Sequence, residues 1–257
     1  MTRRIAVSPR DHAEKGWLPV RGYEFARDRA VVPLAFDELT RAASHIVLGF
    51  IKPNDRYQLV ALLGPGQNAY VHPGDGRWLG AYVPAKLRGE PFELGFTEEN
   101  PNQPILCIDP AQLVEGNADG AEALFNAKGE LQGKSAQALS FLHQRLKGTL
   151  AAEKVTAALT DLLEPWPLRL PRGGEEKTIG GFYRVNEQAL KALSTERLAE
   201  LNQRQGLAVA YAQLVSTGHL AELTKRCELI DRLKADAPTN LDEFFGEGDD
   251  ELMFDFD

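Results

Sequence analysis

Short apolar runs separated by turn residues dominate the first half of the chain. Residues 46–51 and 57–63 are largely apolar, and turn-forming residues 52–55 lie between them, which predicts a β-hairpin. Residues 92–96 and 105–108 continue a series of five or six short strands. The spacing of these strands favours a curved antiparallel sheet or a small barrel over parallel βαβ units.

From Ser135 onward the apolar residues recur at helical spacing. Leu142 and Leu146 belong to a leucine-rich series that predicts helix over most of the next thirty residues. We expect this run to break near Gly148 into two helices. Pro165 ends the helical pattern, because proline cannot continue a helix.

The last part of the chain is also predicted to be helical, after one short strand at residues 182–185. Asn186 is expected to cap a short helix, and Ser194 to start another. The final predicted helix covers residues 206–233, and Gly218 kinks it or divides it in two.

These patterns predict an α+β fold, with a β-rich N-terminal half packed on a helical C-terminal half. We assign residues 1–134 to the β-rich part and residues 135–235 to the helical part of the same unit. The composition of the 257-residue chain, 43% hydrophobic and 26% charged, is that of a globular protein. It excludes fibrous and wholly disordered proteins.

The acidic residues are concentrated at the C-terminal end, in residues 236–257. The chain carries a net charge of −8, but nine acidic residues and no Lys or Arg follow Lys234, so residues 1–235 sum to +1. The overall charge argues against a nucleic-acid partner. The near-neutral body weakens that inference, since it could hold a local basic surface around residues 77–88.

The acidic tail also carries large apolar residues, which a purely solvating segment does not need. The candidate docking residues are Phe244, Phe245, Leu252, Met253, Phe254 and Phe256. In one interpretation the tail only keeps the protein soluble, because like charges repel and ordering them costs entropy. In the other, the tail docks on its own body or on a protein partner.

No targeting segment is visible in the sequence. The apolar run near the N-terminus covers only residues 5–7, whereas a signal peptide needs roughly 7–15 apolar residues. No run approaches the roughly 18–20 apolar residues of a membrane span. We therefore expect a cytoplasmic protein without a membrane span, in which Cys107 and Cys227 are reduced.

Motifs for catalysis or cofactor binding fail on spacing. The segment from Gly129 to Ser135 resembles a phosphate-binding loop, but three residues separate its glycines where the motif needs four. No His-Glu-x-x-His motif or paired-cysteine spacing for a metal site is present. We predict no cofactor and no metal site, and we favour a protein that is not an enzyme.

One segment, residues 68–92, gathers amide, aromatic and arginine side chains in loops. Arginine beside aromatic rings suits recognition of a carboxylate or of a ring, through paired hydrogen bonds or stacking. The ligand-binding candidates are Asn68, His72, Trp78, Tyr82, Arg88 and His219. The alternative is that these aromatic residues seal the sheet and that the arginine bonds buried carbonyl groups.

The same segment begins a resemblance to a known family. Residues 82–92 (YVPAKLRGEPF), 181–190 (GFYRVNEQAL) and 206–216 (GLAVAYAQLVS) resemble the SapC family of bacterial proteins, and the resemblance covers about residues 20–230. That family is named after a surface-layer (S-layer) locus. The resemblance implies an accessory role in surface-layer or uptake systems and supplies no catalytic residues.

Two functions therefore remain as predictions. The first is a SapC-like, noncatalytic binding or assembly accessory protein, with a protein partner for the tail. The second is a small-ligand-binding protein or an enzyme, whose small molecule or peptide is held by the loop region 68–88. A literal surface-layer role would instead place the protein at the cell surface.

Overall fold

The structure is a computed structural model that describes residues 4–96 and 103–235. It has a β-rich N-terminal half with antiparallel sheets and a helical C-terminal part, with 43% helix and 22% strand. This confirms the predicted α+β class. The predicted docking residues of the tail, 236–257, lie outside the described residues.

The largest sheet combines strands from both halves of the chain. Its strands, in spatial order, are β10 (Leu163–Pro165), β13 (Tyr183–Val185), β4 (Leu48–Ile51), β5 (Gln58–Leu62) and β3 (Val31–Pro33). All neighbouring pairs are antiparallel. β4 and β5 form the predicted hairpin, so that prediction is confirmed. At its turn Asn54 has a φ of 49°, a conformation that asparagine tolerates better than most residues.

The other strands form three smaller sheets. These are β1 (Ile5–Ala6), β7 (Ile105–Ile108) and β6 (Phe92–Gly95); β8 (Leu113–Glu115), β2 (Lys15–Trp17) and β9 (Glu122–Ala123); and the hairpin β11 (Leu168–Arg172) and β12 (Glu175–Ile179). The barrel alternative is wrong, since the part of the chain that the structure describes contains no closed barrel. β7 pairs with β6 on one side and with β1 on the other, so these strands do not extend the largest sheet.

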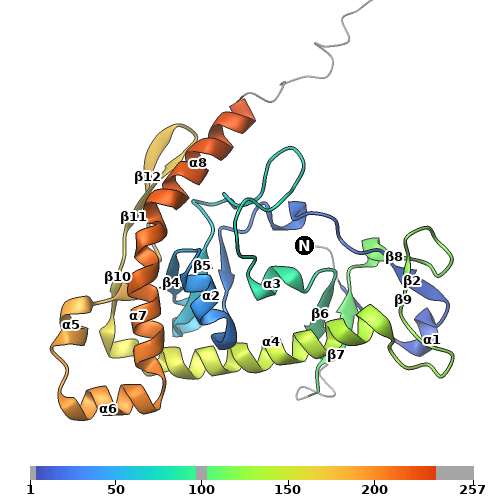
Figure 1. The fold of residues 1–257 in the computed structure, drawn as a ribbon, viewed down its shortest axis with the longest axis horizontal. Helices are drawn as coiled ribbons and strands as arrows, with labels where there is room; N and C mark the ends of the chain where they lie inside the picture. Colours follow the sequence, from blue (N-terminus) through green and yellow to red (C-terminus); the bar gives the residue numbers. More distant parts are fainter. Residues whose placement is uncertain (1–3, 97–102, 236–257) are drawn as a thin grey trace, which may run out of the picture.

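The long helix α4 (Gly133–Ala157) is continuous, and the predicted break at Gly148 is wrong. A Cβ at this position would lie 2.5 Å from Asp37 Oδ1 and 2.9 Å from the Ala35 Cβ. The glycine therefore serves a close approach of α4 to the preceding half of the chain. Figure 1 shows α4 running below the strands β4 and β5 of the largest sheet and crossing β6 and β7.

The C-terminal helices follow the predicted pattern. α5 (Glu187–Lys191) is capped by the Asn186 side chain and α6 (Thr195–Gln203) by the Ser194 side chain. A 3₁₀ turn that contains Gly218 separates α7 (Gly206–Ser216) from α8 (Leu220–Ala235), so the final helix is divided there. α7 and α8 form one column, in which α7 packs on β13 and β4 of the largest sheet and α8 packs on β11 (Figure 1). None of the described helices is long and apolar enough to cross a membrane.

Several short helices connect these elements. They are α1 (Pro9–His12), α2 (Leu39–Ala43), α3 (Ala85–Arg88) and the 3₁₀ turns η1 (Glu24–Ala26), η2 (Phe36–Glu38), η3 (Pro53–Asp55), η4 (Pro110–Gln112), η5 (Thr160–Leu162) and η6 (Thr217–His219). The turn η2 and the helix α2 adjoin each other and together cover residues 36–43.

The apolar core has two clusters, and α4 contributes to both. The larger cluster surrounds the main sheet and includes Val155 from the C-terminal end of α4. The smaller cluster surrounds β6 and β7 and includes Leu142, together with Trp17 and Phe92. The middle of α4, between Leu142 and Val155, therefore bridges the two clusters.

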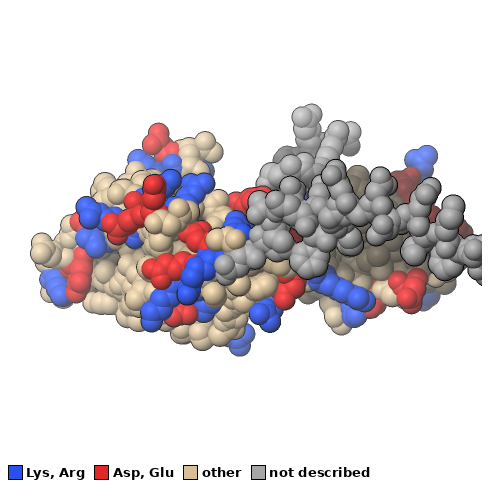
Figure 2. All heavy atoms as spheres, turned by 90° about the horizontal axis from the view of Figure 1, so that it is seen from above, with Lys and Arg blue, Asp and Glu red and all other residues tan. Residues whose placement is uncertain are grey.

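Charged side chains of both signs are interleaved over the uncovered part of the face seen in Figure 2. Many charged residues of the body are paired, as in the ion pairs of Arg184 with Glu164 at 2.8 Å and Lys191 with Glu187 at 2.6 Å. This distribution agrees with a body whose formal charge is close to zero.

Candidate functional site

Asn68 is a buried structural residue. Its Nδ2 atom donates to the Ala26 carbonyl at 3.2 Å, and its Oδ1 atom accepts from the Tyr70 backbone N–H at 2.9 Å. Only 1% of the residue is exposed. Because both ends of the amide are used within the protein, Asn68 holds the loop rather than facing a ligand.

His72 and Trp78 also have partners within their own loop. His72 Nδ1 accepts from the backbone N–H groups of Gly74 and Asp75, each at 3.3 Å. The Trp78 ring stacks on Tyr70 at 5.2 Å, and its indole N–H donates to the Tyr82 carbonyl at 2.9 Å. Trp78 thereby fixes the backbone at Tyr82.

The structure does not bring all six predicted ligand-binding residues together. His219 Nε2 lies 3.2 Å from the Ala43 carbonyl, at the end of α2. Tyr82 and Arg88 line one cavity, which neither His219 nor the residues described above line. Two of the six predicted residues therefore share a site, and the ligand-binding role of the site stays a prediction.

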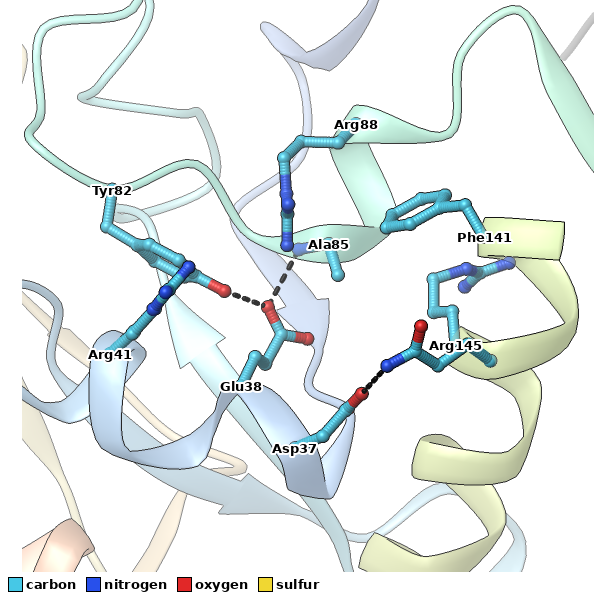
Figure 3. Close-up of a pocket in the computed structure, with 9 residues that line it drawn as sticks. Asp37, Glu38, Arg41, Tyr82, Ala85, Arg88, Phe141 and Arg145 are labelled. Carbon is cyan, nitrogen blue, oxygen red and sulfur yellow. Dashed lines mark hydrogen bonds between the residues drawn. The ribbon is translucent and has the colours of Figure 1, made fainter. Parts of the chain in front are cut away.

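This cavity has a volume of about 350 Å³ and is open to solvent, and we call it the arginine cavity. Three segments of the chain enclose it: η2 with the start of α2, the stretch from Tyr82 through α3, and the middle of α4 (Figure 3). It is lined by Asp37, Glu38, Arg41, Tyr82, Ala85, Arg88, Phe141, Gln144 and Arg145.

Glu38 forms the floor of the cavity and joins two of its walls. Its Oε1 atom accepts from the Ala35 N–H at 2.8 Å, which is the glutamate half of a capping box at η2, since alanine has no side-chain acceptor for the other half. Its Oε2 atom accepts from the Tyr82 hydroxyl and from the Ala85 N–H, both at 2.7 Å. Glu38 is only 5% exposed, so these three donors replace water around its carboxylate.

Tyr82 stays protonated well above neutral pH. Burial and the hydrogen bond to the Glu38 carboxylate raise the pKa of the Tyr82 hydroxyl above its ordinary value, because both disfavour a second negative charge. The hydroxyl is therefore a fixed donor to Glu38. The pair positions the start of α3 and with it Arg88.

Three arginine side chains surround this floor, each from a different helix (Figure 3). The Arg88 guanidinium lies 5.3 Å from the Phe141 ring centroid and 5.9 Å from that of Tyr82, so it stands over both rings. Arg41 and Arg88 are exposed residues, and Arg145 is half-buried. Burial lowers the pKa of Arg145, because the partly dry site disfavours its charge.

None of the three arginines forms an ion pair within residues 4–96 and 103–235, although Asp37 and Glu38 line the same cavity. The Nε atom of Arg145 is buried and has no hydrogen-bond partner among these residues. Asp37 instead accepts from the Gln144 side chain at 3.3 Å. The formal charge of the cavity is positive, and its guanidinium groups are available to an anion.

The cavity does not suit a metal ion, because guanidinium groups repel cations. In the described portion of the chain no group of three or more His, Cys, Asp or Glu residues could hold a metal. An oxyanion such as a carboxylate or a phosphate fits the donor set, since each guanidinium can offer two parallel N–H groups.

Sequence reasoning missed Glu38, Arg41 and Arg145. The signal at Arg145 is its spacing of four residues from Phe141, which places both on one face of α4. Glu38 stands three residues after Ala35, at the position where a capping box places its carboxylate. Neither signal shows that these segments meet segment 82–88.

The comparisons with known proteins give one result that bears on the family. The SapC family model matches residues 7–223, which include all three walls of the arginine cavity. No curated protein and no solved structure matches the chain. Because the match spans most of the sequence, the chain belongs to the SapC family.

Proposed function

We propose that this SapC-family protein is a binding protein whose arginine cavity holds the anionic groups of a small molecule or peptide. The surface-layer or uptake context implied by the family is the setting that we propose for this binding. Whether binding takes place in the cytoplasm or at the cell surface is a separate prediction, which cell fractionation checks.

The observation that carries the proposal is that Arg145 has no ion pair among the described residues. Its guanidinium is half-buried, its Nε atom is buried without a partner among the described residues, and burial lowers its pKa. A buried donor without a partner costs about 1–3 kcal/mol, and an incoming anion removes that cost. Arg41 and Arg88 line the same cavity and supply two further guanidinium groups.

The state of the other polar groups favours binding over proton-transfer catalysis. Glu38 already accepts three hydrogen bonds, and the raised pKa of Tyr82 keeps its hydroxyl protonated at neutral pH. Three of the roughly four acceptor positions of the Glu38 carboxylate are occupied by these donors, which leaves little capacity to accept a proton from a substrate. These two groups therefore organise the cavity, and the arginines remain to contact the ligand.

The aromatic side chains narrow the ligand class. Phe141 and Tyr82 line the cavity beside Arg88, so an apolar or aromatic portion of a ligand can pack next to its anionic group. We infer a ligand with more than one carboxylate and an attached ring. Benzylsuccinate, which carries two carboxylates and one benzene ring, is a suitable probe.

Calorimetric titration of the full chain with benzylsuccinate tests the proposal. We expect binding that weakens about tenfold or more in Arg88→Gln and Arg145→Gln, since each removes a charge-assisted hydrogen bond. Arg204→Gln is the matched control, because Arg204 is exposed on the C-terminal side of α6 and pairs with Glu200 at 3.2 Å. Inorganic phosphate serves as a second probe that carries charge without a ring.

The outcomes separate clearly. Binding of benzylsuccinate but not of its neutral diamide, lost in both cavity variants and retained in Arg204→Gln, supports the proposal. Equal binding of phosphate would assign the cavity to oxyanions in general, without a role for the rings. Absence of binding of both anions, or equal affinity in all variants, would overturn it.

A further inference from the structure

We propose that residues 252–257 of the chain occupy the arginine cavity of the same molecule and compete with its external ligand. This inference rests on the proposed function, because it names a peptide segment of the ligand class that the cavity takes. It also selects one of the two interpretations of the acidic tail, docking on the body of the chain.

The first argument is chemical complementarity. Residues 252–257 read Leu-Met-Phe-Asp-Phe-Asp, so aromatic and acidic side chains alternate in this segment. The cavity presents arginine side chains beside the rings of Tyr82 and Phe141. The arginines can pair with the carboxylates of the segment, and the rings can pack against its phenylalanines. Many other charged side chains of the body form ion pairs with one another, whereas the cavity arginines have no ion-pair partner among the described residues.

The second argument is reach. The described chain ends at Ala235, the end of α8, and 22 residues follow it. Fully extended they reach about 75 Å. The column from Ala235 back to Gly206 spans about 45 Å at 1.5 Å per residue, and α4 from its C-terminal end to Arg145 adds about 18 Å. Even this indirect path is shorter than the tail.

The residue pattern selects the distal part of the tail over the proximal part. In residues 254–257 each Phe is followed by an Asp, whereas Phe244 and Phe245 stand next to each other. Fully extended, residues 254–257 lie about 65–75 Å of chain beyond Ala235, which covers even the indirect path along the column and α4.

A competition experiment on full-length variants gives the first test. Replacing Phe254 and Phe256 by Ser, and Asp255 and Asp257 by Asn, removes the proposed occupant. We expect benzylsuccinate affinity to rise about threefold to tenfold, the size expected for removal of a tethered weak competitor. The matched control replaces Phe244 and Phe245 by Ser and Asp242 and Glu243 by their amides, and should leave the affinity unchanged.

A nitroxide label gives a test that needs no ligand. The label is attached to Asp250→Cys in a chain with Cys107→Ala, since Cys227 is buried at 3% exposure. We expect selective broadening of backbone amide signals from residues 82–88 and 141–145, and its loss in the double variant Arg88→Gln, Arg145→Gln. Broadening that is absent or uniform over the protein would overturn the inference.

A mixing experiment distinguishes a tail that docks on its own molecule from a tail that docks on a second copy of the chain. Labelled unenriched protein is added to nitrogen-15 protein without a label. Broadening in this mixture equal to that within one molecule would mean that the tail occupies a second copy, which contradicts the proposal. Unchanged benzylsuccinate affinity in the distal variant, with normal binding in wild type, would remove this inference and leave the proposed function standing.

Discussion

Two groups of charged residues flank α3, and they differ in whether their cations form ion pairs with their anions. On one side lies the paired cluster, defined as Arg4, Arg29, Lys86, Glu90 and Glu93. Arg4 lies 2.5 Å from Glu90 and 3.2 Å from Glu93, Lys86 pairs with Glu93, and Arg29 lies 3.6 Å from Glu90. On the other side lies the arginine cavity, whose guanidinium groups have no ion-pair partner within the described residues.

The comparison shows that residue type alone does not identify a binding site. Both regions contain arginines and glutamates at partly buried positions. In the paired cluster the cations and anions satisfy each other, so it joins the N-terminal strand region to the segment around Glu90. In the cavity the carboxylate of Glu38 is taken by neutral donors, which leaves the guanidinium groups for another anion.

The largest effect on stability is expected within the cavity, at its floor. Glu38→Ala leaves the Tyr82 hydroxyl and the N–H groups of Ala35 and Ala85 without their acceptor. We expect a loss of about 4 kcal/mol in the free energy of unfolding, near the upper end for one substitution. Urea unfolding followed by circular dichroism measures it, and a loss below about 1 kcal/mol would show that Glu38 is not the floor described here.

The next prediction compares the two regions directly. Arg4→Gln leaves Glu90, whose side chain is 10% exposed, without its nearest partner, so we expect a loss of about 3 kcal/mol. Arg88→Gln removes an exposed arginine that has no ion pair among the described residues, so we expect a loss of no more than about 1 kcal/mol, from its contacts with two rings. Unfolding curves that show equal losses in both variants would erase the distinction between the regions.

A pH dependence sharpens the role of Tyr82. Tyrosine ionises near pH 10 in an unfolded chain, and the native pKa of Tyr82 is higher. Above pH 10 the native state therefore holds more protons, and stability falls with pH by up to about 1.4 kcal/mol per unit from this residue. The slope between pH 9 and 11 should be shallower in Tyr82→Phe than in wild type. Tyr211→Phe, at a tyrosine that is 55% exposed, is the matched control for the loss of a phenol hydroxyl.

The smallest effect concerns the remaining carboxylate of the cavity. Asp37 accepts a hydrogen bond from Gln144 at 3.3 Å and places a negative charge beside the arginines. Asp37→Asn removes that charge, so we expect benzylsuccinate to bind about two- to threefold more tightly, as for a partly exposed charge near an ion-binding site. Calorimetry measures this change, and weaker binding would instead make Asp37 part of the recognition.

Local patterns predicted much of the fold. The hairpin of β4 and β5, the caps at Asn186 and Ser194 and the division at Gly218 each depend on residues close together in the sequence. The prediction at Gly148 was wrong for a nonlocal reason. Its missing side chain admits Asp37, more than a hundred residues earlier, and a helical pattern holds no information about that contact.

Only some of the residues that line the cavity could be predicted from the sequence. Tyr82 and Arg88 stand in one aromatic and arginine-containing loop, so their residue types drew attention to it. Arg145 lies on α4, and the helical spacing of the apolar residues predicts only that its position is polar. Arg145 approaches segment 82–88 because α4 packs across both core clusters. Patterns among neighbouring residues cannot predict that packing, since it joins segments far apart in the sequence.

The most direct test of the account is the response of individual arginine side chains to the probe. Nitrogen-15 spectra of the arginine Nε–H groups are recorded on the full chain as benzylsuccinate is added. We predict that the signals of Arg41, Arg88 and Arg145 shift, and that those of Arg4 and Arg29 stay in place. Shifts of equal size in both sets, or shifts confined to Arg4 and Arg29, would contradict the claim that the arginine cavity is the anion-binding site.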